Sequence, residues 1–434
     1  MALALPDHDL RSALTNEVHA RPFAPLSAPA RATHLALYRG EQGQDSDYAH
    51  LLTLYERYGV EPPGAAAAQH MADFGTFRLK WERHTEFTTY TFLRSGGSPD
   101  APFGDPALTA VPEDWLVAIP GEIMVAVHAE IESPAAAPRD PAALAALFGT
   151  DSFAGSLVTG GGAAAWMDFA MSLDGFGRLL IQDRGLRPRQ RGRLLQRLLE
   201  IETYRVMALL GLPLAQSAGP VLGEANERML SITERMAGQA MLEDERALLD
   251  ELTGVSQRIE GLAARTGYRF GAARAYYALV QRRIEELREE RIEGLQMIAE
   301  FMDRRLAPAM RTCEAVAERI DRMSRRLARA GQLLRTRVDI QLEAQNRDLL
   351  RSMNRRAELQ LRLQETVEGL SVAAITYYLV GLIAYALKAL KAAGLTVPID
   401  SLTGLSIPFV AALVWYGVRR VRRMVAKQSN HADA

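Results

Sequence analysis

Cysteine is almost absent from this sequence. The 434 residues contain a single one, Cys313, so no disulfide can form within the chain. A lone thiol fits a protein that resides in a reducing compartment. Cys313 lies in an arginine-rich stretch with no histidine nearby in the sequence, so no partner base is evident for a cysteine nucleophile.

Sequence motifs for phosphate binding and hydrolysis are also missing. A Walker loop needs a lysine after its glycines, but Thr159–Gly162 (TGGG) is followed by three alanines, which favours a turn between two strands. There is no G-x-G-x-x-G leading into a helix, no G-x-S-x-G and no H-x-x-x-H or H-E-x-x-H. The sequence therefore predicts no catalytic residues, no cofactor and no metal site.

Long apolar runs are missing from most of the chain. The first thirty residues lack the apolar core of a signal peptide, so we expect the soluble part not to be exported. Two uncharged runs occur near the end, at Leu370–Leu387 and Leu402–Val418. About 20 apolar residues in a helix cross roughly 30 Å of hydrocarbon, so these runs predict a two-helix transmembrane hairpin within residues 369–420.

Basic residues predict the orientation of this hairpin. Five follow the second run, whereas the connecting segment has two lysines and one aspartate: Arg419, Arg420, Arg422, Arg423 and Lys427, against Lys388, Lys391 and Asp400. Basic flanks favour the cytoplasmic side, so the basic tail at 421–434 and the N-terminal part are both expected in the cytoplasm. Residues 1–150 carry 10 basic against 19 acidic residues, which predicts an acidic head.

The first half of the chain is typical of an α/β domain. After an irregular segment at 1–30, residues 31–215 alternate strand-like and helical patterns. The expected strands are Thr33–Tyr38, Phe74–Lys80, Glu86–Leu93, Ile123–Ile131, Ser156–Val158, Ala164–Phe169 and Gly177–Ile181. The expected helices are Asp45–Tyr58, Ala142–Phe148 and one that begins at Pro188 and is stopped by Gly211 and Pro213.

Two polar clusters are the candidate site residues of this head. Leu14–Phe23 (LTNEVHARPF) contains Asn16, Glu17, His19 and Arg21, and the turn before Glu86–Leu93 contains Arg83, His84 and Glu86. They supply acid, base and cation types that general acid–base chemistry uses, if the two clusters meet. The first is equally compatible with a short capped helix that Pro22 stops.

Residues 216–368 predict a helical stalk. Leu222–Gly254 and Val255–Thr266 read as helices broken at glycines, and apolar residues then recur every three or four positions from Leu295 to Val338, as in a coiled coil. Pro308 is expected to kink or divide this helix, which otherwise continues into the first span. Arginines alternate with acids here, which favours a solvated helix surface over nucleic-acid binding.

Small and polar residues in the first span are candidates for helix packing or for lining a pore: Ser371, Thr376, Tyr377 and Gly381. A membrane hairpin on a coiled coil predicts a homo-oligomer that contacts lipid.

Two stretches resemble an uncharacterised family of predicted bacterial membrane-anchored proteins: LTNEVHARPF with RHTEFTTYTF, and SMNRRAELQLRLQETVEGLSVAAITYYLVGL. This resemblance implies a location in the bacterial inner membrane but no activity. The order of head, long helix and two spans is also similar to CorA-type magnesium channels, although the Gly-Met-Asn motif of those channels is missing here.

Three functions follow as hypotheses. The first is a non-enzymatic, membrane-anchored oligomeric scaffold whose head binds an unknown ligand or partner. The second is a divergent CorA-like cation channel, which rests on the architecture alone. The third is an enzyme that uses the two polar clusters of the head.

Overall fold

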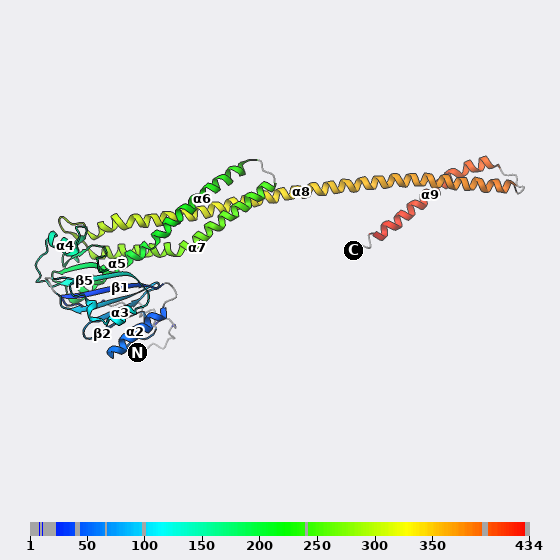
Figure 1. Ribbon diagram of the computed structural model, residues 1–434. Coiled ribbons are helices and arrows are strands. Elements are labelled where there is room, and N and C mark those ends of the chain that lie inside the picture. Colours follow the sequence, from blue (N-terminus) through cyan, green and yellow to red (C-terminus); the bar gives the residue numbers. More distant parts are fainter. Residues whose placement is uncertain are drawn as a thin grey trace, which may run out of the picture. The chain divides into compact units, whose positions relative to one another are not determined.

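The computed structural model describes residues 8, 11, 23–39, 44–65, 67–97, 101–238, 242–392 and 398–429. It has an α+β fold, in which a nine-stranded mixed sheet near the N-terminus is followed by long helices (Figure 1). The chain divides into two compact units. The first comprises Met1–Gln239 and Asp250–Gly331, and the second comprises Ala240–Leu249 and Gln332–Ala434.

The sheet belongs to the first unit and has the strand order β2-β3-β4-β1-β5-β8-β7-β6-β9. Its strands are β1 (Ala30–Tyr38), β2 (Gln69–Asp73), β3 (Arg78–Arg83), β4 (Phe87–Ser95), β5 (Glu122–Glu132), β6 (Ala154–Val158), β7 (Ala163–Met167), β8 (Gly177–Asp183) and β9 (Glu290–Arg291). Only β5 and β8 pair in parallel among the described strands. The sheet is therefore built mostly from antiparallel neighbours, which short connections can join.

The helices are short within the head and long after it. They are α2 (Gln44–Tyr58), the 3₁₀ helix η1 (Ala107–Ala110), α3 (Glu113–Val117), α4 (Pro141–Phe148), α5 (Pro188–Leu209), α6 (Gly211–Ala237), α7 (Leu242–Leu287), α8 (Ile298–Ala392) and α9 (Ile399–Ser429). The predicted strands and helices of residues 31–215 are present within a few residues of their expected bounds, with one exception. In the predicted strand Phe74–Lys80, residues 74–77 form the turn between β2 and β3. The turn predicted at Thr159–Gly162 joins β6 to β7.

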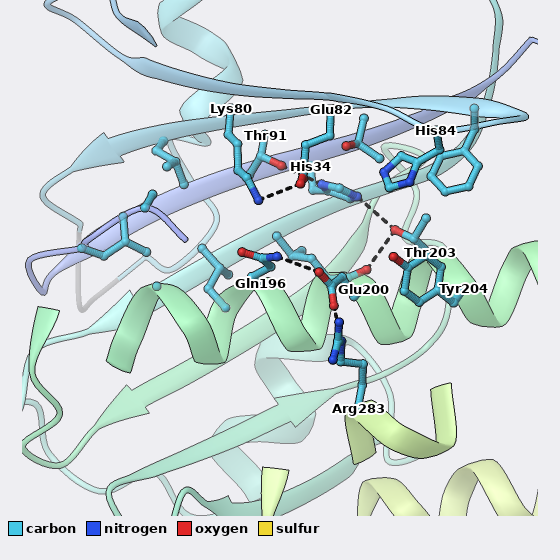
Figure 2. Close-up of a pocket in the computed structure, with 18 residues that line it drawn as sticks. His34, Lys80, Glu82, His84, Thr91, Gln196, Glu200, Thr203, Tyr204 and Arg283 are labelled. Carbon is cyan, nitrogen blue, oxygen red and sulfur yellow. Dashed lines mark hydrogen bonds and ion pairs between the residues drawn. The ribbon is translucent and has the colours of Figure 1, made fainter. Parts of the chain in front are cut away.

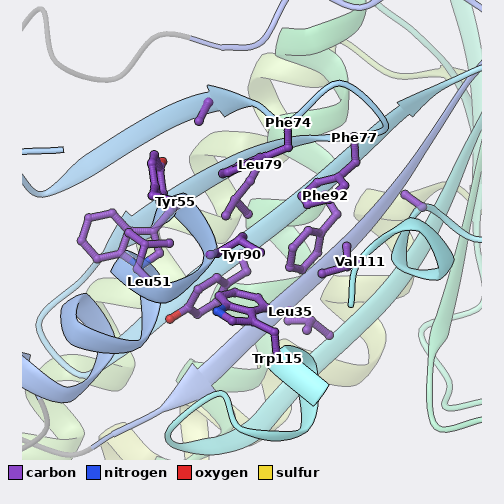
Figure 3. Packing of buried hydrophobic residues seen from close by; sticks show 14 of the residues in the cluster. Leu35, Leu51, Tyr55, Phe74, Phe77, Leu79, Tyr90, Phe92, Val111 and Trp115 are labelled. Carbon is purple, nitrogen blue, oxygen red and sulfur yellow. The ribbon is translucent and has the colours of Figure 1, made fainter. Parts of the chain in front are cut away.

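Strands β3 and β4 present different chemistry on their two faces because successive side chains of a strand alternate between faces. On one face Tyr90 and Phe92 pack with Trp81 of β3, Leu51 of α2 and Trp115 of α3 (Figure 3). On the other face Lys80, Glu82 and Thr91 point toward α5 (Figure 2), and Thr89 lines the same cavity. Full burial of one large apolar side chain stabilises a fold by about 1.5–3 kcal/mol, so the aromatic layer holds the polar face in place.

The predicted end of the helix that begins at Pro188 is confirmed, because α5 ends at Leu209. A second helix, α6, then begins directly at Gly211 and includes Pro213. A proline is tolerated in the first turn of a helix, where its missing N–H has no intrahelical partner. Gly211 also serves packing: a Cβ there would lie 3.1 Å from Ala273 Cβ and 3.3 Å from Cys313 Sγ.

The predicted break at Gly254 is absent. Helix α7 runs without interruption from Leu242 to Leu287 and includes four glycines. One glycine costs a helix only about 1 kcal/mol relative to alanine, which packing of the other residues offsets. Pro308 likewise does not divide α8, which is 95 residues long and contains the first predicted span.

The apolar seam of α8 is buried within the first unit. Its residues from Ile298 to Ala330 lie against α6 and α7 of the same chain, where Arg326 donates to Asn226 and Gly331 approaches Leu252. Short strand β9, in a region predicted to be wholly helical, pairs with β6 next to the start of α8. This part of the predicted stalk is therefore an intramolecular bundle joined to the sheet.

Three helical segments are long and apolar enough to cross a membrane, where the sequence predicted two. Among the described residues these are Pro188–Ala237, Ile298–Leu390 and Ile399–Val421. The second and third contain the predicted spans. The first, formed by α5 and α6, was predicted as a helical part of the head and stalk.

Candidate functional site

A cavity of about 180 Å³ lies between the polar face of the sheet and α5, wholly within the first unit (Figure 2). Its floor comes from β1, β3 and β4, its wall from α5 and Arg283 of α7, and its rim from the segment before β1. It is lined by Ala24, Leu26, His34, Lys80, Glu82, His84, Phe87, Thr89, Thr91, Leu93, Gly192, Leu195, Gln196, Leu199, Glu200, Thr203, Tyr204 and Arg283.

Strand register brings the floor residues together. Lys80 is paired with Thr91, and Glu82 with Thr89, across β3 and β4. His34 of β1 is paired with Thr91 from the other side. Residues directly opposite in an antiparallel pair share one face, so five polar side chains form one continuous patch.

His34 is held by hydrogen bonds at both ring nitrogens. Its Nδ1 lies 2.8 Å from Thr91 Oγ1 and its Nε2 lies 3.0 Å from Thr203 Oγ1. Thr203 donates its own hydroxyl proton to Leu199 O at 2.9 Å, so it accepts from His34 Nε2–H, and Nδ1 accepts from Thr91. This neutral tautomer leaves no free nitrogen to act as a base.

Burial lowers the pKa of His34 from 6.5 to about 3, and the charges of Lys80 and His84 add to the effect. Below pH 6.5 the unfolded chain binds a proton that the folded chain does not, so His34 reduces stability as the pH falls from 6.5 toward 3. We expect the free energy of unfolding to fall less steeply over this range in His34→Gln than in the natural protein, by up to about 1.4 kcal/mol per pH unit.

Thermal unfolding of both proteins at pH 7 and pH 5 measures this difference. His128, whose pKa burial lowers to about 4, titrates in the same range in both proteins and cancels in the comparison. Equal acid sensitivity of the two proteins would contradict the neutral, doubly bonded His34.

Lys80 and Glu82 form a charged pair on the cavity floor. Lys80 Nζ lies 2.9 Å from Glu82 Oε1, and the two side chains are 8% and 16% exposed. Despite this ion-pair distance, Nζ makes no hydrogen bond to the described residues. Thr89 Oγ1 is also buried without a hydrogen bond to any residue that the structure describes. The floor thus offers donors and acceptors that a bound molecule can satisfy.

A second charged group closes the wall. Arg283 pairs with Glu200 and lies 3.0 Å from Glu286, and Gln196 donates to Glu200 at 2.7 Å. Burial is opposed by these two carboxylates, which raise the pKa of Arg283 above its usual value. The positive charge of Arg283 in the cavity wall is therefore balanced by neighbouring carboxylates.

The structure separates the predicted polar cluster Arg83, His84 and Glu86. His84 lines the cavity and stacks on Phe87 with ring centroids 4.3 Å apart. Arg83 lies over the Trp81 ring at 5.1 Å, whereas Glu86 pairs with Arg269 of α7. Only His84 is therefore a cavity residue. The other predicted cluster, Asn16, Glu17, His19 and Arg21, lies outside the described residues.

The candidate residues of the first span lie in the second unit. Ser371 and Thr376 donate to the carbonyls of Val367 and Val372 in their own helix, at 2.8 and 2.7 Å. Tyr377 is 77% exposed, and a Cβ on Gly381 would meet nothing within 4 Å. The hydroxyls are satisfied by the helix itself, and a packing or pore-lining role stays a prediction.

Comparison with protein families shows to which family the chain belongs. A family model described as a protein of unknown function (DUF3422) matches residues 6–425. The chain belongs to the DUF3422 family. No match among curated proteins was found. Neither comparison supports the similarity to CorA-type channels.

In this DUF3422 protein, sequence reasoning missed most of the cavity floor. The signal was present in two strands where polar and aromatic residues alternate, Arg78–Arg83 (RLKWER) and Phe87–Ser95 (FTTYTFLRS). Polar residues facing inward at alternate positions are unusual for a buried strand, and they mark a face that is not filled by apolar packing. The sequences of the two strands do not predict which residues of α5 cover that face.

Proposed function

We propose that this DUF3422 protein is a membrane-anchored homo-oligomer whose cytoplasmic head binds a small ligand, and that it acts as a scaffold rather than as an enzyme. The observation that carries the proposal is the exposure of the apolar residues in α8 and α9. Such surfaces are unfavourable in water and favourable in lipid.

Burial distinguishes the two proposed spans from the third apolar segment. None of the residues in the most apolar window of Ile298–Leu390 is buried, and 6% are buried in that of Ile399–Val421. In Pro188–Ala237 the share is 33%, and Met207, Ala215 and Leu222 are among the buried residues of this segment. We therefore assign the two C-terminal segments to the membrane and α5–α6 to the soluble head.

Basic residues support the orientation. Arg419 and Arg420 directly follow the second apolar run, and Arg419 lies over the Trp415 ring at 4.8 Å. Tryptophan and arginine are common at the cytoplasmic membrane interface. The two helices then form a hairpin in the bacterial inner membrane, with both ends of the chain in the cytoplasm.

An exposed apolar stripe on α8 supports oligomerisation. Leu350, Met353, Ala357 and Leu361 follow at spacings of three and four residues, and the three larger side chains are 61%, 57% and 57% exposed. This spacing places them on one side of a helix, where a second copy of the same helix can bury them as a coiled coil. The stripe lies in the second unit, beyond the seam that α6 and α7 bury.

The cavity supports a binding role for the head. Its volume of about 180 Å³ far exceeds the roughly 10–15 Å³ that one water requires, and it is below the roughly 300 Å³ of a drug-sized site. A small metabolite fits this range. His34 has both nitrogens bonded and Lys80 is paired with Glu82, an arrangement suited to binding more than to proton transfer.

The mass of the detergent-solubilised particle tests the proposal. The full chain should stay in the membrane fraction after an alkaline wash, and the solubilised particle should contain at least two copies of the 47.8 kDa chain. Replacing Leu350, Met353 and Leu361 by serine should reduce the particle to one chain. Serine at Gln345, Arg355 and Arg362, which are exposed and lie away from the stripe on α8, should not. Release of the natural protein by the wash, or a single-chain particle, would contradict the proposal.

A further inference from the structure

We propose that the cavity beneath α5 binds a small zwitterionic metabolite with a short aliphatic side chain, such as an aliphatic amino acid. Its carboxylate would lie at Lys80 and its ammonium at Glu82. The inference rests on the proposed ligand-binding role of the head and names the class of ligand.

Charge balance in the cavity selects a zwitterion. Lys80 and Glu82 neutralise each other, and Arg283 is matched by Glu200. An anion that paired with Lys80 would leave the Glu82 carboxylate without its partner in a site where only 16% of that side chain is exposed. Leaving one buried charge unpaired is costly. A ligand carrying both charges replaces one ion pair with two.

Unused hydrogen-bonding groups lie at the same place. Lys80 Nζ and Thr89 Oγ1 are buried and make no hydrogen bond to the described residues, although Nζ is 2.9 Å from Glu82. Lys80 and Thr89 are 7% and 3% exposed, and both line the cavity. Thr89 lies opposite Glu82 in the strand register, so its hydroxyl can donate to a carboxylate or accept from an ammonium beside this pair. Burying such groups is favourable only when a partner satisfies them.

The remaining walls set the size and the polarity of the rest of the ligand. Leu26, Leu93, Leu195 and Leu199 supply aliphatic surface around the charged floor. The cavity volume of about 180 Å³ is below the roughly 300 Å³ of a drug-sized site. A branched side chain of a few carbons fits this space.

Calorimetric titration of the full chain in detergent with three matched probes tests the inference. The probes are L-leucine, 4-methylpentanoate, which lacks the ammonium, and 3-methylbutylamine, which lacks the carboxylate. We expect leucine to bind at least tenfold more tightly than either partial analogue. Binding of a partial analogue as tightly as leucine, or no binding of leucine, would overturn the zwitterion assignment.

Two variants assign the charges. Glu82→Gln should weaken leucine binding about tenfold and strengthen 4-methylpentanoate binding, because the anion then no longer leaves a buried carboxylate unpaired. Lys80→Met should weaken leucine binding and strengthen 3-methylbutylamine binding for the corresponding reason. The control is Glu318→Gln, which breaks an exposed ion pair with Arg322 on α8 and should not change the binding of any of the three probes. An equal loss of affinity for all three probes in a cavity variant would contradict the assignment of the charges. If a variant does not fold, titration of the natural protein still tests the ligand class.

Failure of this inference can be distinguished from failure of the proposed function. If leucine fails but another class of metabolite raises the unfolding temperature of the natural protein, the ligand class is wrong and the binding head is retained. If no metabolite in a broad set raises the unfolding temperature, the proposed ligand-binding role of the head is wrong as well. The particle mass and membrane attachment are measured independently of both.

Discussion

Replacing Arg269 by methionine is expected to lower the stability of the head by about 3–5 kcal/mol. Arg269 contacts both carboxylate oxygens of Glu86, each at 2.9 Å, and Glu86 is 2% exposed. Oε2 accepts a hydrogen bond from Nη1, and Oε1 lies at ion-pair distance from Nη2, so the Glu86 charge is compensated by one guanidinium. The variant leaves Glu86 buried, with Tyr276 OH at 3.3 Å as a hydrogen-bond donor to its carboxylate.

Amide hydrogen exchange in β4 measures this loss, because it reports local opening free energies in a detergent-solubilised protein. The double variant Arg269→Met with Glu86→Gln removes both charges and should recover most of the stability. Arg322→Met, which breaks the exposed pair with Glu318, should cost no more than about 1 kcal/mol. A loss below 1 kcal/mol in Arg269→Met would show that Glu86 does not depend on this partner.

Replacing Gly192 by alanine is expected to displace the segment at the cavity rim. A Cβ at Gly192 would lie 1.8 Å from the carbonyl oxygen of Ala24, a backbone atom that no side-chain rotation can move away. The segment is held at this place because Leu26 N donates to Pro188 O at 3.0 Å and Arg191 donates to Leu26 O at 3.1 Å. We expect a cost of about 1–3 kcal/mol, as for other overpacked sites.

The displaced segment carries Ala24 and Leu26, two walls of the cavity, so the same variant should weaken ligand binding. Faster exchange of the Leu26 amide would report the displacement. Gly223→Ala in α6 is the matched control: its Cβ would meet nothing within 4 Å, and the change should stabilise the helix by about 0.4–1 kcal/mol. An unchanged Leu26 amide in Gly192→Ala would contradict the close approach.

The polar clusters show how far local reasoning reaches into a site. The turn at Arg83, His84 and Glu86 was identified from residue types alone, and one of the three side chains lines the cavity. Arg83 lies over Trp81, two residues away in the same strand, whereas Glu86 has a partner that no local pattern reveals. Glu86 reaches Arg269, 183 residues away in the sequence. Residue type predicts that a buried carboxylate needs a partner, but only the packing of α7 on the sheet selects it.

By itself, the sequence determined the elements that depend on local periodicity. Alternation at period two predicted the strands, spacing at three and four predicted the long helices, and two uncharged runs in α8 and α9 marked the proposed spans. The tertiary structure decided what depends on distant contacts. Helix α6 begins at Gly211, where an added Cβ would lie 3.1 Å from Ala273 Cβ, and β9 joins the sheet beside β6. Lys80, Glu82 and Thr89 line a cavity because β3 and β4 pair in one register and α5 covers that face, and strand pairing between distant segments leaves no mark in local sequence.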